Sequence, residues 1–285
     1  MKHPAGPTIP RWQLGESLRR LRGTRDPKEG AQRLGCSIRK IHNIEAGEVR
    51  IVRTELEALL DLYGHDNSEE REWFMELQRL GNKRGWWSKY GRLPTPFAEF
   101  LGIESAATQI EIFEPLVVTG LMQTRSYALA LEAGVTPGQT VEQVEKQVNL
   151  RMDRQEQVLK PEDGPEIWVV YDESVVHRMV GGSTVMREQL LHLIDLSDSK
   201  AITLQVVPFV QGGYPGTLGQ MNIFSFDEEL HTPVGYVESQ AGNLYMEKPE
   251  EIRRLTTAYN HIRSTALSPE HSVKLLKQQA QKLKE

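Results

Sequence analysis

Apolar side chains recur at helical spacing along the first 80 residues. Leu14, Leu18 and Leu21 lie at positions i, i+4 and i+7, which predicts a buried stripe on a helix from Trp12 to Arg22. Four further helices are expected, over 27–34, over 37–46, through Leu56, Leu59, Leu60 and Tyr63, and through Trp73, Leu77 and Leu80. Residues 1–80 are therefore predicted to form an all-helical N-terminal domain.

The ends of the second and third helices follow from individual residue types. Asp26 is a favourable N-cap, and Pro27 suits the first position of a helix because the N–H that it lacks has no partner there. Gly35 suits a tight turn, and Ser37 is a second N-cap. Two helices joined by one short turn are thus expected before Gly47.

The pattern changes after residue 80. Residues 81–96 are rich in Gly, Trp and Pro and are interpreted as a connection, whereas 97–131 and 140–159 have helical patterns. Strands are expected at 167–171, 202–207, 221–226 and 234–238, helices at 173–180, 185–196 and 249–265, and a fraying helix at 268–285. The predicted fold class is α+β, with the five-helix domain followed by a larger mixed α/β domain at 97–285.

Charge is divided unevenly along the chain. Residues 1–53 hold 12 Lys and Arg against 5 Asp and Glu, a net charge of +7, whereas the whole chain has a net charge of -5. A basic N-terminal region on an acidic chain concentrates the attraction for phosphate at one end. The charge therefore favours nucleic acid as a partner of residues 1–53.

The run from Ala31 to Gly47 is the strongest functional signal. A short turn makes two helices cross steeply, so that the second can enter a major groove, where Arg reads guanine, Asn reads adenine and Lys contacts phosphate. An αα-hairpin inside a helical domain is the alternative. The candidate DNA contacts are Ser37, Ile38, Arg39, Lys40, His42 and Asn43, with Arg50 and Arg53 just beyond.

Polar residues of the second domain form a weaker candidate site. Asp172 and Glu173 follow a predicted strand, a position where α/β proteins often place site residues. A ligand or partner site would bring them together with Arg151, Arg154, Tyr236 and Glu238. Alternatively, the two carboxylates cap a helix and the arginines form a salt-bridged face.

Other chemistry has little support in the sequence. The eight histidines and the single cysteine are scattered without a metal-ligand spacing, so neither a metal nor a cofactor is expected. No nucleophile elbow is present, so no enzymatic activity is expected. Apolar runs are far shorter than the roughly 20 residues that span a bilayer, and one thiol forms no intrachain disulfide. A cytoplasmic protein is expected.

The segment from Leu14 to about Tyr63 resembles the Cro/CI-type (XRE) DNA-binding domain. The similarity is greatest in the tag Ile41-His42-Asn43-Ile44-Glu45-Ala46-Gly47. It implies a five-helix domain that reads DNA with residues 37–46. The sequence departs from this family at Pro27, where Gln is usual, and at Gly30, where a core Leu is usual, which implies a loosely packed second helix.

Short motifs in the rest of the chain resemble a C-terminal domain of unknown function in actinobacterial XRE regulators. These are antitoxin-like proteins similar to the WhiJ group, and the resemblance implies a small companion protein. The motifs are Trp86-Trp87, Glu114 to Thr124, Tyr127-Ala128, Arg151 with Arg154-Gln155, Val206 to Phe209, Tyr236 to Glu238 and Ala266 to Pro269.

The combined prediction is a transcription regulator. Its N-terminal domain binds a double-stranded operator, and its C-terminal domain senses a signal or binds a companion protein and forms a homodimer. One alternative is an antitoxin-like module that neutralises a small partner and regulates its own synthesis. The other is an enzyme of unknown reaction that carries a DNA-binding domain.

Overall fold

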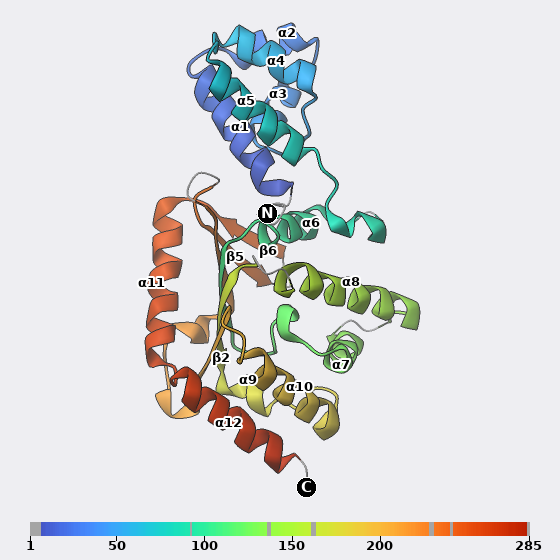
Figure 1. Ribbon diagram of the computed structural model, residues 1–285, viewed down its shortest axis with the longest axis vertical. Coiled ribbons are helices and arrows are strands. Elements are labelled where there is room, and N and C mark those ends of the chain that lie inside the picture. The colour runs from blue at the N-terminus through green and yellow to red at the C-terminus, as the bar shows by residue number, and fades with distance from the viewer. Residues whose placement is uncertain are drawn as a thin grey trace. The chain divides into compact units, whose positions relative to one another are not determined.

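A computed structural model of the chain describes residues 7–91, 93–135, 138–160, 164–227, 231–239 and 242–283. The chain divides into two compact units (Figure 1). The first unit extends to Ala106 and the second begins at Ala107, apart from a short segment at Asp227 and His231 that groups with the first. The first unit is helical and the second contains a sheet, so the predicted α+β class is confirmed.

The first unit contains the five predicted helices. The helix α1 begins earlier than expected, at Thr8, because Ile9 joins the buried stripe. The elements are α1 (Thr8–Arg22), α2 (Pro27–Leu34), α3 (Ile38–Glu45), α4 (Arg53–Leu62), α5 (Ser68–Gly81), the 3-10 helix η1 (Trp86–Tyr90) and α6 (Thr95–Glu104).

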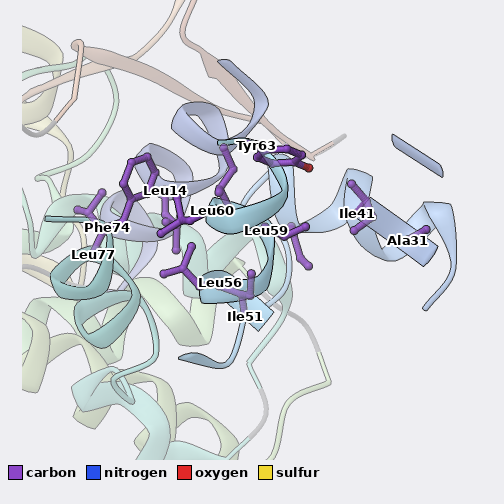
Figure 2. Close-up of a cluster of buried hydrophobic side chains, with 12 residues drawn as sticks. Leu14, Ala31, Ile41, Ile51, Leu56, Leu59, Leu60, Tyr63, Phe74 and Leu77 are labelled. Atoms are coloured by element: carbon purple, nitrogen blue, oxygen red, sulfur yellow. The ribbon is translucent and has the colours of Figure 1, made fainter. Parts of the chain in front are cut away.

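The helices α1 to α5 enclose one apolar core, whose side chains are shown in Figure 2. The predicted buried face of α5 is wrong by one position. Trp73 is 40% exposed, whereas Phe74 is 4% exposed and packs with Leu77 in the core. Trp73 instead lies edge-on against Phe74, with 5.0 Å between the ring centroids.

The expected packing gap at Gly30 is filled. A Cβ atom at Gly30 would lie 3.2 Å from the hydroxyl of Tyr63 and 3.4 Å from methyl groups of Ile41 and Leu59. A leucine at this position would therefore overlap with Tyr63. The helix α2 packs closely through Gly30 and Ala31, both buried, and the expectation of a loose second helix is not met.

The second unit is built on a six-stranded sheet. Its elements are β1 (Gln109–Glu114), η2 (Gly120–Met122), α7 (Arg125–Val135), α8 (Val141–Leu159), β2 (Glu166–Asp172), α9 (Glu173–His177), α10 (Gly182–Leu196), β3 (Ile202–Val207), η3 (Phe209–Gln211), η4 (Pro215–Leu218), β4 (Met221–Ser225), β5 (Val234–Ser239), β6 (Gly242–Met246), α11 (Pro249–Thr265) and α12 (Pro269–Lys282).

The strand order is β3-β2-β1-β4-β5-β6. The strands β1, β2 and β3 are parallel, and β4 to β6 continue the sheet antiparallel from β1. In Figure 1, α11 covers one face of the sheet, and α7 to α10 lie on the other. On the α11 face, Phe113, Val170 and Val207 pack against Tyr259 and Ile262. The sheet therefore changes from parallel to antiparallel pairing at β1, which is parallel to β2 and antiparallel to β4.

The structure departs from the description that the sequence predicts for this unit in three places. Residues 97–131 are not continuously helical, because the central strand β1 lies within them. The strand β6 was not expected. The last helix, α12, does not fray over its described length, since Leu276 is fully buried and α12 packs against α10 and β3. No helix in the described part of the chain is long and apolar enough to cross a bilayer.

The residues around Ser268 close one edge of the sheet. The N–H of Leu267 donates to the carbonyl of Val206 over 2.9 Å, and the N–H of Val206 donates to the hydroxyl of Ser272 over 2.9 Å. The outer side of β3 at Val206 is therefore covered by Leu267, before α12, and by Ser272 in its first turn.

Candidate nucleic-acid interface

The helices α2 and α3 are joined by the turn that the sequence predicts. The Asp26 carboxylate accepts from the N–H of Lys28 over 2.8 Å, and the Ser37 hydroxyl accepts from the N–H of Lys40 over 3.3 Å. Gly35 has a φ of 62°, a left-handed conformation that favours glycine. Each helix thus begins at a side-chain cap, and the turn between Leu34 and Ile38 is short.

The outward face of α3 contains most of the predicted DNA contacts. Ile41 and Ile44 are buried in the core, whereas Ser37, Ile38, Arg39 and His42 are exposed and Asn43 is half-buried. These exposed positions lie on one side of the helix because they recur at i, i+1 and i+4. The α3 face combines a guanidinium, an imidazole and an amide with one aliphatic side chain, which suits base edges in a major groove.

The other three predicted contacts are held by the protein itself. The Lys40 ammonium forms an ion pair with Glu55 of α4, and a guanidinium nitrogen of Arg50 donates to the carbonyl of Lys83 over 3.2 Å. Arg53 pairs with Glu57 over 2.9 Å, and both side chains are exposed. An exposed pair of this kind contributes little, so Arg53 can exchange Glu57 for a phosphate.

A buried ion pair anchors the end of α3 to the end of α1. The Arg22 guanidinium donates to both carboxylate oxygens of Glu45, over 2.6 Å and 3.0 Å. These hydrogen bonds raise the pKa of Arg22 above its ordinary value, although partial burial opposes them. Sequence reasoning missed this pair. Its signal is that Glu45 continues the spacing of Ile41 and Ile44 and so falls on the buried stripe.

The chain that follows α3 is also anchored. The side-chain amides of Gln78 on α5 and of Asn82, the residue that follows α5, both donate to the carbonyl of Ile51, over 3.0 Å and 2.8 Å. Ile51 itself is buried in the core. The backbone between α3 and α4 is therefore positioned by the end of α5, as α3 itself is positioned by α1.

In the second unit, the predicted carboxylates hold loops in place. Asp172 caps α9 by accepting from the N–H of Ser174 over 2.8 Å, and its other oxygen accepts from the hydroxyl of Tyr214 over 2.5 Å. Glu173 accepts from the N–H of Phe209 over 2.7 Å. The helix-cap alternative describes Asp172, whereas Glu173 is bound by the backbone of Phe209.

The predicted arginines belong to a second group, around Glu114. Arg151 is bound to Glu132 and Gln123, as expected for a salt-bridged face. Burial, together with the nearby Glu238, raises the pKa of Glu114 to about 8, although Arg154 opposes them. Glu114 was not singled out by the sequence reasoning, because its burial arises only when β1 takes the centre of the sheet.

Tyr236 lies on the strand β5. It is buried, and its ring lies 5.2 Å from that of Tyr245. Within the described residues, no three His, Cys, Asp or Glu side chains gather as metal ligands.

Two family models match the chain, one in each of its two parts. A family model described as "Helix-turn-helix domain" matches residues 13–74, which span α1 to α5 except for the ends of α1 and α5. The chain is therefore a helix-turn-helix protein of the DNA-binding kind. A second family model, "Domain of unknown function (DUF5753)", matches residues 97–278. Since this match covers more than half of the chain, the chain belongs to the DUF5753 family. None of the curated proteins and none of the solved structures compared with it gave a match.

Proposed function

We propose that the chain is a sequence-specific transcription regulator of the Cro/CI (XRE) type, which reads its operator with α3. The observation that best supports this proposal is the exposed face of α3. Its polar side chains face outward while Ile41, Ile44 and the Arg22–Glu45 pair hold the helix from behind. A reading helix needs such support, because base recognition depends on side chains held in a fixed geometry.

Each exposed residue has a role in this proposal. Arg39 donates to a guanine edge and Asn43 pairs with an adenine, whereas Ile38 contacts a thymine methyl group. Lys40 neutralises a phosphate once it exchanges Glu55 for the DNA. Arg53 contacts the backbone in the same way.

The test is a gel-shift titration with operator fragments selected from genomic DNA by the protein. Arg39→Ala and Asn43→Ala should each weaken specific binding by about 1–3 kcal/mol and relax the preference at one base pair. Arg20→Ala is the matched control, since it removes an exposed arginine on α1 that is paired with Glu16. Full operator affinity in the Arg39→Ala/Asn43→Ala double variant would show that α3 does not read the DNA.

The second unit is proposed to contact another protein, and we assign it no enzymatic reaction. The support lies beside α9, where Ser174 donates to the carbonyl of Pro115 over 2.5 Å and Arg178 donates to that of Leu116 over 2.9 Å. The side chains of Leu116, Phe209 and Val210 are exposed on the loops held there. Apolar side chains displayed on anchored loops are typical of protein-binding surfaces.

A second copy of the chain is the partner that this proposal favours, and a small companion protein, as in an antitoxin, is the alternative. Sedimentation of the full chain and of a Leu116→Ser/Phe209→Ser variant distinguishes them. Loss of a dimer in the variant supports self-association through these loops. A parent chain that is monomeric but co-purifies with a small protein at fixed stoichiometry, with that protein lost from the variant, supports the companion.

A further inference from the structure

The first unit contains a cavity of about 650 Å³, and none of the residues that line it belongs to α3. Its walls come from α1, from the chain that follows α3, from η1 and from α6. This volume lies within the range of small-molecule sites, which is about 300–1,000 Å³. The lining residues that matter most are Arg11, Glu48, Arg50, Arg84, Trp87 and Glu99.

Three guanidinium groups line this cavity against two carboxylates. Arg11 is half-buried, and its Nε has no hydrogen-bond partner. Burial and the nearby Arg50 lower the pKa of Arg11, while Glu99 opposes them. Burial and a neighbouring cation thus disfavour the charged form of Arg11. An anion in the cavity would relieve this, because guanidinium groups form strong charge-assisted hydrogen bonds with phosphate and carboxylate.

The cavity also has a rigid apolar wall. Trp87 is largely buried and lies edge-on against Trp86, with 5.7 Å between the ring centroids. The indole N–H of Trp86 in turn donates to the hydroxyl of Ser105 over 3.3 Å. Leu93 and Ala98 line the same cavity. A ligand with an aromatic or aliphatic part therefore has a preformed surface on which to pack.

We propose that this cavity binds a small organic anion, whose phosphate or carboxylate is held by Arg11, Arg50 and Arg84 and whose apolar part packs against Trp87. Such a ligand would contact Arg50 on the chain between α3 and α4. Its binding is a property of the first unit alone, and it is separate from the recognition of base edges by α3.

Calorimetric titration of the full chain without DNA, at constant ionic strength, tests this proposal with three probes. Phenyl phosphate and benzoate distinguish phosphate from carboxylate, and inorganic phosphate tests the contribution of the apolar part. We expect one of the aromatic anions to saturate at one molecule per chain, about tenfold more tightly than inorganic phosphate. Saturation by none of the three would overturn the proposal.

Variants locate the site. Arg84→Gln alters an exposed side chain, so it should leave folding intact and weaken binding of the aromatic anion about tenfold. Arg11→Gln should have at least this effect, and Arg20→Gln, the control on α1, should have none. If Arg84→Gln weakens operator binding but leaves the anion titration unchanged, the arginines serve the DNA backbone and the proposal is wrong.

Discussion

The Arg22–Glu45 pair is expected to determine whether α3 stays in place. The side chain of Arg22 is 13% exposed and that of Glu45 is 5% exposed. Glu45→Ala would leave the guanidinium without its carboxylate in a partly buried position. Removing one partner of a buried pair costs about 3–5 kcal/mol. Arg22 keeps a hydrogen bond to the carbonyl of Arg25, over 2.8 Å, so we expect the lower end, about 3 kcal/mol.

This loss is large for a unit of this size. Domains of about 100 residues are stable by about 5–15 kcal/mol, so the variant would lose a substantial fraction. Hydrogen exchange of the full chain, followed by mass spectrometry, measures the effect in α3 itself. A loss of about 3 kcal/mol corresponds to amide exchange that is faster by about two orders of magnitude where opening limits exchange.

Two further variants separate burial from charge. Glu57→Ala breaks the exposed pair with Arg53, and it should change stability by about 1 kcal/mol or less. Arg22→Met/Glu45→Leu removes both buried charges and should recover most of the stability that Glu45→Ala loses. Equal exchange rates in α3 of Glu45→Ala and Glu57→Ala would refute the reasoning, because burial would then make no difference.

Three other predictions concern DNA affinity, pH and assembly. Glu55→Gln frees the ammonium of Lys40 from an ion pair that it must otherwise break to reach a phosphate, so DNA binding should tighten at low salt in a gel-shift series. Glu114 has a pKa of about 8 in the fold against its usual 4.5, so the folded state holds the extra proton and stability should fall as pH rises between these values. In urea titrations, Glu114→Gln should abolish this fall, and an unchanged pH dependence would contradict it. A fragment of residues 1–80 should sediment as a monomer that binds DNA weakly, whereas the full chain should dimerise; a dimeric fragment would place the contact in the first unit.

The parts of the fold that depend on neighbouring residues were predictable from the sequence. The caps at Asp26 and Ser37 and the turn at Gly35 are local, and the structure has them where the sequence places them. The stripe of Ile41 and Ile44 likewise determines which face of α3 remains outside. The exposed residues of α3 follow from these features alone.

What the sequence did not predict depends on partners distant in the chain. The strand β1 carries Glu111 and Glu114, charged residues that do not mark a central strand, and it is stabilised by pairing with β2 and β4. The ion pair of Lys40 with Glu55 spans two helices. The filling of the space at Gly30 by Tyr63 requires α2 and α4 to be packed together.

The closure of β3 by residues 267–272 has a consequence for synthesis on the ribosome. The strand β3 emerges from the ribosome well before the segment that pairs with its outer edge. Until Leu267 and Ser272 have also emerged, the N–H and C=O groups of Val206 lack these hydrogen-bond partners. By then the helices α1 to α5 are already available to fold, because domains generally fold as units from the N-terminus. During that interval the growing chain presents a finished DNA-binding fold together with an open sheet edge, which is a template for pairing with a strand of another molecule. Nascent chains on neighbouring ribosomes would therefore be at greatest risk of aggregation just before Leu267 is made.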